Sequence, residues 1–178
     1  MAFRYSVSLA KILKDNTFEV LHMPKDPAEI LISSRDINRP GLLLSGFEEY
    51  FDSGRINFLG KTEMGYIESY PEEDRRRKVE LFMSKKPACV VVTRSLPCPD
   101  ELLEFAKKYE VPLLVTNDTT SRSMAALIAY LNVELAERIT RHGVFVEVYG
   151  EGVLILGDSG VGKSESAVEL IKRGHRLI

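Results

Sequence analysis

Residues 153–178 contain the pattern that most restricts how this chain can fold. Four apolar residues, 153–156, precede eight residues with the spacing G-x-x-x-x-G-K-S, and a stripe of Ala167, Leu170 and Ile171 follows. A short apolar run is typical of a buried strand, and apolar residues three and four apart indicate one face of a helix. The segment therefore predicts a strand, a glycine loop and a helix in immediate succession.

The glycine loop fits a phosphate-binding P-loop at every fixed position. Its residues are Gly157, Asp158, Ser159, Gly160, Val161, Gly162, Lys163 and Ser164. Glycine lets backbone N–H groups converge on phosphate oxygens, an approach that a β-carbon would block. Lys163 can neutralise β- and γ-phosphates, the Ser164 hydroxyl suits Mg²⁺, and the helix that begins near Gly162 adds its positive end. The other interpretation is a glycine-rich turn that only joins a strand to a helix.

A second α/β pattern begins at Pro87. Residues 87–93 and 112–116 predict two buried strands, and residues 99–110 predict an amphipathic helix between them. Residues 117–119 (Asn-Asp-Thr) offer N-cap side chains for a further helix. The apolar stripe of that helix contains Met124, Leu127, Ile128, Leu131 and Leu135. The pattern predicts an α/β fold in which these strands are parallel.

The first part of the chain gives a weaker pattern. Residues 18–23, 29–33 and 55–59 predict strands, and residues 39–41 predict a turn. Residues 72–78 are a dense charged run, which favours a solvated helix face over an anion site because the acids cancel the bases. We expect three ion pairs between residues four apart on that helix: Glu72–Arg76, Glu73–Arg77 and Asp74–Lys78.

Two domains are predicted, residues 1–134 and residues 135–178. The helical stripe ends near residues 132–137, where two apolar runs joined by a glycine-containing turn predict a β-hairpin. Leu177 and Ile178 predict the opening of a further strand. Because only fourteen residues follow Ser164, we expect the chain to be the first part of a longer P-loop protein.

Composition excludes several classes of protein. The chain is 44% hydrophobic and 28% charged, which provides a large core and argues against disorder. The net charge of −2 argues against a nucleic-acid surface, and no apolar run is long enough to cross a membrane. Residues 1–16 lack the apolar core of a signal peptide, so we expect a cytoplasmic protein. Cys89 is expected to be a buried free thiol, and a disulfide with Cys98 stays open.

Three segments of the second half closely resemble bacterial HPr kinase/phosphorylase. Residues 141–144 are Arg-His-Gly-Val, residues 157–165 are the loop followed by Glu165, and residues 169–177 are Glu-Leu-Ile-Lys-Arg-Gly-His-Arg-Leu. The resemblance is dense over residues 137–178. It is looser before them, where residues 39–42 (Arg-Pro-Gly-Leu), the order of the elements and the domain length agree.

This resemblance implies a bifunctional enzyme. The family phosphorylates a serine of HPr, the phosphocarrier of the sugar phosphotransferase system, with ATP or pyrophosphate and Mg²⁺. It also reverses the reaction, when inorganic phosphate attacks the phosphoserine and gives pyrophosphate. The setting is carbon catabolite repression. The resemblance further implies homo-hexamers formed largely by the C-terminal half, a first domain similar to that of muramyl ligases, and a P-loop domain similar to phosphoenolpyruvate carboxykinase.

Residue by residue, the resemblance assigns His142 and Lys163 to catalysis, residues 157–164 to the nucleotide, and Ser164 to Mg²⁺. His142 by itself would be a plain turn residue, and Glu165 matches without a definite role. His22 and His175 are expected to be structural. The family's catalytic aspartate and second metal carboxylate would follow residue 178, so we expect this chain alone to be inactive. The alternatives are a small-molecule P-loop kinase, and an interaction or ligand-sensing module formed by residues 1–136.

Overall fold

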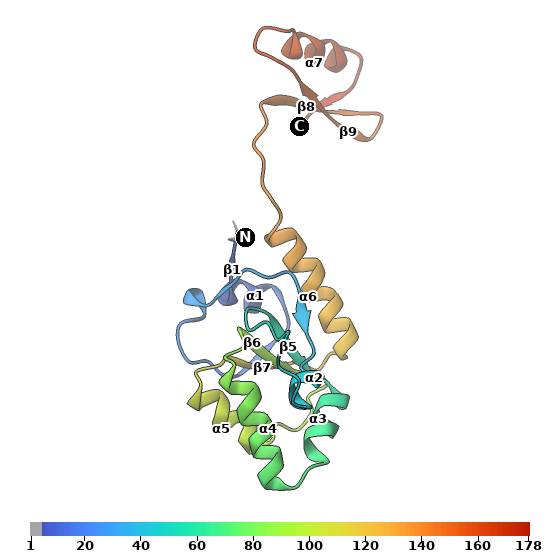
Figure 1. Ribbon diagram of the computed structural model, residues 1–178. Helices are drawn as coiled ribbons and strands as arrows, with labels where there is room; N and C mark the ends of the chain where they lie inside the picture. The colour runs from blue at the N-terminus through green and yellow to red at the C-terminus, as the bar shows by residue number, and fades with distance from the viewer. Residues whose placement is uncertain (1–4) are drawn as a thin grey trace. The chain divides into compact units, whose positions relative to one another are not determined.

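The computed structural model describes residues 5–178 and divides the chain into two compact units, Met1–Glu137 and Arg138–Ile178 (Figure 1). We call them the N-terminal and C-terminal units. The sequence predicts that residues 1–16 are not a signal peptide. Residues 1–4 of that segment lie outside the described residues. The sequence places the domain boundary between residues 134 and 135, near the end of the last helix of the N-terminal unit.

A mixed five-stranded sheet forms the centre of the N-terminal unit, in the order β2-β7-β6-β5-β4. Strands β4 (Ile37–Asn38), β5 (Ile56–Leu59), β6 (Cys89–Val92) and β7 (Leu113–Val115) are parallel neighbours. Strand β2 (Glu19–His22) pairs with β7 in the antiparallel direction and forms one edge. The prediction of parallel strands within residues 87–93 and 112–116 is therefore confirmed.

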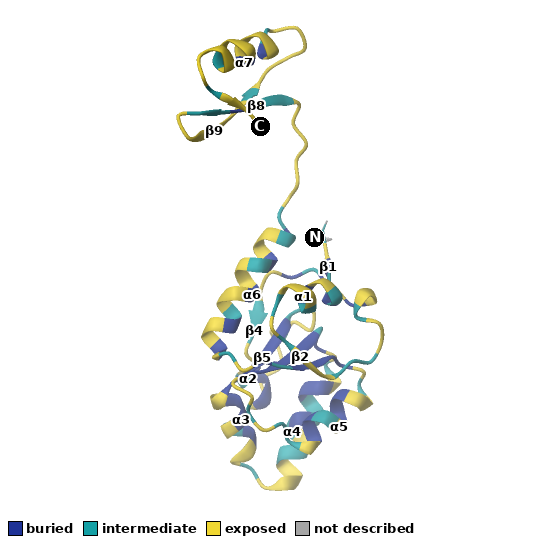
Figure 2. Ribbon diagram, turned by 180° about the vertical axis from the view of Figure 1, so that it is seen from behind, coloured by how far each residue is buried: buried dark blue, intermediate teal, exposed yellow. Residues whose placement is uncertain are grey.

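Helices cover both faces of this sheet, because alternate strand residues point to opposite sides. On one face, Val90 and Val92 pack against α3 (Lys61–Glu68), α4 (Glu72–Ser84) and α5 (Asp100–Lys108). On the other face of the sheet, Cys89 and Val91 belong to a separate hydrophobic cluster. That cluster contains residues of α1 (Leu9–Asp15) and α6 (Thr120–Glu134). Figure 2 shows the buried strands between helices whose outer faces are exposed. The α/β prediction is confirmed as a three-layer unit.

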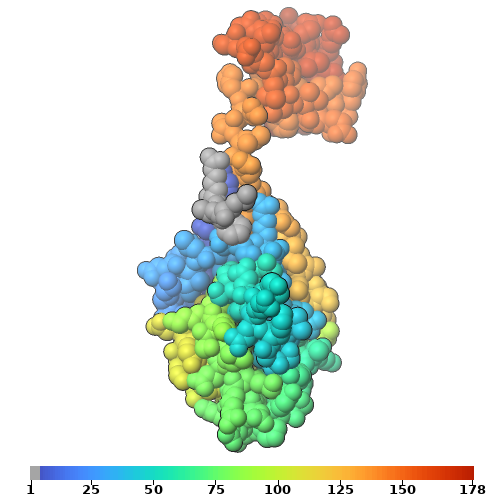
Figure 3. Space-filling view, in the orientation of Figure 1, coloured from blue at the N-terminus to red at the C-terminus, as the bar shows by residue number. Residues whose placement is uncertain are grey.

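Short elements complete the N-terminal unit. Strands β1 (Val7–Ser8) and β3 (Leu31–Ile32) form a separate antiparallel ribbon, and η1 (Pro27–Glu29) is a single turn of 3₁₀ helix. The strand predicted at 29–33 is thus only two residues long, since the chain is still in the 3₁₀ turn at Glu29. After the turn at Pro40, α2 (Gly41–Leu44) is one helical turn. Figure 3 shows the residues around α2, in light blue and cyan, on the visible face of the unit.

The charged run at 72–78 begins α4, as predicted, and Arg77 forms the expected ion pair with Glu73. The predicted pairs Glu72–Arg76 and Asp74–Lys78 are wrong. The Arg76 guanidinium binds both carboxylate oxygens of Glu104 on α5, at 2.9 and 2.7 Å. The Lys78 ammonium donates to the Leu44 carbonyl and lies 4.3 Å from the centre of the Tyr70 ring. Neighbouring helices, which spacing along one helix cannot reveal, supply these partners.

The C-terminal unit is a three-stranded antiparallel sheet, in the order β10-β8-β9, with one helix. Strands β8 (Gly143–Val148) and β9 (Glu151–Leu156) form the predicted hairpin, and β10 (Arg176–Leu177) is the predicted further strand. Helix α7 (Lys163–Lys172) follows the glycine loop. Of its predicted stripe, Ala167 is buried, Leu170 is half-buried and Ile171 is 40% exposed.

Both cysteines are free thiols, so a disulfide between them is excluded in this structure. Cys89 is fully buried on β6, as expected from its apolar neighbours, and Cys98 is half-buried. Across residues 5–178, the helices are too short or too polar for any of them to span a membrane.

Candidate functional site

The glycine loop connects the end of β9 to the start of α7 without an intervening element. Gly160 and Gly162 have backbone φ angles of +82° and +92°, which are strained for any residue with a side chain. A β-carbon on Gly157 would lie 2.8 Å from the Val161 Cγ1 atom. The loop curls tightly: its backbone favours glycine at 160 and 162, and a side chain at 157 would displace the exposed Val161 side chain.

Lys163 is the first residue of α7, and only 8% of its surface is exposed. Its ammonium donates to the backbone carbonyl oxygens of Gly157 and Asp158, each at 2.7 Å. A lysine ammonium has three N–H donors, so one donor is left for an anion. The spacing of the motif predicts that a lysine lies here. It does not predict that the loop's own carbonyls hold it, because that depends on the curl.

The N-terminus of α7 offers backbone donors at the same place. Ser166 N–H makes the first intrahelical bond, to the Gly162 carbonyl, and this leaves the three preceding N–H groups of the helix without an intrahelical acceptor. Unpaired N–H groups and the positive helix end favour a bound phosphate. Glu165 is exposed in this first turn. The site therefore combines one ammonium with several backbone donors, which is what a di- or triphosphate needs.

Ser164 is exposed beside these donors, and no hydrogen bond of its hydroxyl occurs within the described part of the chain. Among the same residues, no group of three or more His, Cys, Asp or Glu side chains could hold a metal by itself. Mg²⁺ commonly takes one or two protein oxygens and completes its octahedron with substrate phosphates and water. A single free serine hydroxyl next to a phosphate site fits that mode of binding.

His142 is exposed and directly precedes β8. The hairpin register pairs Gly143 with Leu156, so one further step places His142 opposite Gly157, the first residue of the loop. Opposite residues in an antiparallel pair are about 4.5–5.5 Å apart at Cα. The register thus brings His142 and the loop to the same end of the hairpin, although they are fifteen residues apart in the sequence.

The two other described histidines lie in different segments of the chain. His22 is on β2, its Nε2 atom is buried without a hydrogen-bond partner, and burial followed by the charge of Lys107 lowers its pKa. His175 follows α7, and its ring packs edge-on against Tyr149 with 4.8 Å between the ring centres. A structural role for both residues stays a prediction.

A strand, a curled glycine loop and a helix that begins with a buried lysine define the class: an α/β protein with a P-loop. Residues 7–131 match the family described as HPr Serine kinase N terminus, and residues 133–178 match the HPr Serine kinase C-terminal domain. The chain belongs to the HPr serine kinase family.

Curated relatives agree along nearly the whole chain. It is 46% identical over 174 residues to the HPr kinase/phosphorylase of Caldicellulosiruptor bescii, and 44% identical to that of Lachnoclostridium phytofermentans. Each match covers 98% of this chain and 56% of the relative, so the chain spans about half the length of these proteins. A solved structure of the CBS and DRTGG domains of a Clostridium perfringens pyrophosphatase covers 72% of the chain and 46% of its own, with 17% identity and a TM-score of 0.48. That similarity is too low to support an argument.

Proposed function

We propose that this protein is a bifunctional HPr serine kinase/phosphorylase. It phosphorylates a serine of HPr with ATP or pyrophosphate, and it removes that phosphate by phosphorolysis with inorganic phosphate. The family membership and the names of the relatives support this function. The single observation that carries it is the P-loop, in which Lys163 and the free N–H groups of α7 converge.

In this proposal each site residue has one task. The N–H groups of residues 157–164 bind the donor phosphates, and Lys163 neutralises the charge on the transferred group. Ser164 supplies a hydroxyl oxygen to Mg²⁺, which when bound neutralises phosphate charge. His142, at the open end of the hairpin, stabilises phosphate charge on the transferred group. Both directions use the same site: the serine hydroxyl displaces ADP or phosphate in one, and phosphate displaces the serine oxygen in the other.

The same resemblance supports wider proposals. We place the protein in the cytoplasm, as a homo-hexamer assembled largely through its C-terminal half, and in carbon catabolite repression. We also propose that the N-terminal unit is similar to the first domain of muramyl ligases. The P-loop unit would then be related to phosphoenolpyruvate carboxykinase. The three-layer α/β arrangement and the strand–loop–helix order are consistent with these relationships.

Substitution of Lys163 in the complete gene product tests the proposal. Lys163→Ala should abolish both HPr phosphorylation and dephosphorylation, because both place charge at one phosphate site. Lys172→Ala is the matched control, since it removes an exposed lysine from the same helix. Wild-type rates in either direction for Lys163→Ala would contradict the P-loop assignment. Transfer to a small hydroxyl compound, with none to HPr, would favour a small-molecule kinase.

A histidine substitution separates catalysis from binding. His142→Ala should slow phosphoryl transfer by about 10²-fold or more while nucleotide affinity changes little, because its expected role is charge stabilisation during transfer. His175→Ala is the control, since that histidine packs against Tyr149. An unchanged transfer rate for His142→Ala would contradict a catalytic role and support the interpretation of His142 as a turn residue.

A further inference from the structure

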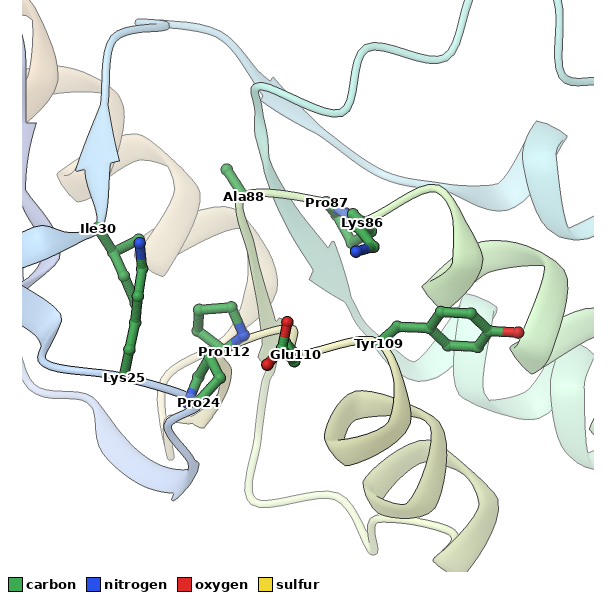
Figure 4. A pocket seen from close by; sticks show the side chains of 9 residues that line it. All are labelled: Pro24, Lys25, Ile30, Lys86, Pro87, Ala88, Tyr109, Glu110 and Pro112. Atoms are coloured by element: carbon green, nitrogen blue, oxygen red, sulfur yellow. The ribbon is translucent and has the colours of Figure 1, made fainter.

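A cavity of about 310 Å³ opens in the N-terminal unit, far in sequence from the glycine loop. It lies where β6 and β7 begin, because Ala88 and Pro112 directly precede these strands and line it (Figure 4). Three of its lining residues are apolar and buried: Ile30, Pro87 and Pro112. Ligand sites usually measure roughly 300–1,000 Å³, so this cavity suits a small molecule.

Three charged side chains surround this apolar floor: Lys25, Lys86 and Glu110. Within residues 5–178, none of the three forms an ion pair or a side-chain hydrogen bond. Several charges on α4 and α5 are paired, as Lys108 is with Glu80 at 2.5 Å. The cavity therefore presents two free cations and one free anion above an apolar surface.

Lys86 and Glu110 both have a left-handed backbone conformation. Lys86 and Glu110 follow the C-caps of α4 and α5, and their φ angles are +50° and +58°. Glycine is the common residue at this position, and the left-handed conformation costs another residue roughly 1 kcal/mol. Both helices thus end on a charged residue where glycine would be less strained, and both of these residues line the same cavity.

We propose that this cavity binds a free α-amino acid with an apolar side chain. Its carboxylate would bind Lys25 or Lys86, its ammonium would bind Glu110, and its side chain would cover Ile30 and the prolines. A simple anion would pair with the lysines but leave Glu110 unpaired, and a simple cation would be repelled by the two lysines. A zwitterion with an apolar group pairs with Glu110 and with one lysine and covers the floor, while the second lysine, which is exposed, stays hydrated. This inference does not depend on the proposed phosphoryl transfer.

Titration of the 178-residue chain with L-leucine, L-methionine and L-phenylalanine tests the proposal. We expect at least one of them to shift the backbone amide NMR signals of residues 86, 88–90, 110, 111 and 113 at concentrations up to about 10 mM, where even a weak site fills. Two analogues of leucine, each lacking one of its charged groups, test the two charges one at a time. Leucinamide lacks the carboxylate and 4-methylpentanoate lacks the ammonium, and each should bind at least about tenfold more weakly.

Glycine variants remove the charges without risk to the fold, because glycine is the least strained residue at these φ angles. Lys86→Gly and Glu110→Gly should each weaken binding about tenfold. Lys61→Gln should not, because that exposed lysine follows the carboxyl end of β5, away from the start of β6 and β7. The proposal is overturned if no amino acid binds, if the analogues bind as well as leucine, or if Glu110→Gly has no effect. Equal binding of inorganic phosphate would also overturn it, in favour of a plain anion site.

Discussion

The contribution of Lys163 to phosphate binding can be worked out from its hydrogen bonds. Two of its three N–H donors are held by the carbonyls of Gly157 and Asp158, so one is free. A phosphate oxygen can take the free donor without breaking either bond. A second contact would require the release of one carbonyl, which largely offsets its own gain. We therefore count one charged hydrogen bond, worth about 1.5–3 kcal/mol.

Lys163→Ala should accordingly weaken the binding of Mg²⁺-pyrophosphate to the 178-residue chain by about tenfold to 150-fold. The loop should survive the change, because the carbonyls of Gly157 and Asp158 lie in an exposed segment where water can replace the ammonium. Isothermal titration calorimetry measures the affinity, with Lys172→Ala as the control for net charge. The amide NMR signals of β8 and β9 report whether the hairpin is intact.

Two results would refute the reasoning. If Lys163→Ala binds pyrophosphate within about twofold of the wild type, the ammonium does not contact the ligand. If Lys163→Ala and Lys172→Ala weaken binding equally, the effect is one of net charge and not of position. A larger loss, beyond about 10³-fold, would show that the ammonium leaves both carbonyls and bridges two phosphates.

Three further outcomes follow from the structure. Arg75→Ala should destabilise the N-terminal unit by about 1–3 kcal/mol, because it leaves the nearly buried Glu101 carboxylate without its guanidinium. Burial alone would raise the pKa of Glu101, but its backbone hydrogen bond and Arg75 outweigh burial and lower the pKa from 4.5. The difference between variant and wild type, measured by urea unfolding, should therefore shrink as pH falls below that value. Burial chiefly raises the pKa of Cys98 to about 11, so its alkylation by iodoacetamide should be slow at neutral pH and accelerate toward pH 11. Gly162→Ala should lower the thermal stability of the C-terminal unit, because alanine is strained at a φ of +92°. Gly41→Ala should have little effect on the N-terminal unit, since a β-carbon there would meet no atom within 4 Å.

The central strands and helices of the N-terminal unit were predictable because their patterns are local. Strands β6 and β7 are buried on both faces and therefore are short continuous apolar runs. Helix α6 begins at the expected cap, where the Thr119 hydroxyl accepts from the Arg122 N–H. The ribbon of β1 and β3 was not predictable in this way. Its strands are two residues long, and only pairing across the chain defines them.

Sequence spacing likewise predicted only the ion pair that lies within one helix. Spacing predicted the Glu73–Arg77 pair, which lies within one turn of exposed helix. It failed for Arg76, whose partner Glu104 belongs to another helix. The cavity at Lys86 could not be predicted from the sequence, for a different reason. A lysine in a left-handed turn has no sequence signal, since glycine is the residue that patterns recognise there. Local patterns thus predict the glycine loop, while tertiary packing decides what surrounds it.

The position of His142 follows from the hairpin turn and not from any property of histidine. Tyr149 and Gly150 have φ angles of +53° and +86°, which is typical of a two-residue turn with strands in one fixed register. A slip of one residue would place Arg141 or Gly143 opposite the loop instead. Tyrosine is a poor residue for this turn, at a cost of about 1–2 kcal/mol. Tyr149 is 91% exposed, so its edge-on contact with His175 offsets only a small part of that cost. The hydrogen-bonded ladder of β8 and β9, and not this ring contact, therefore holds the register that brings His142 to the loop.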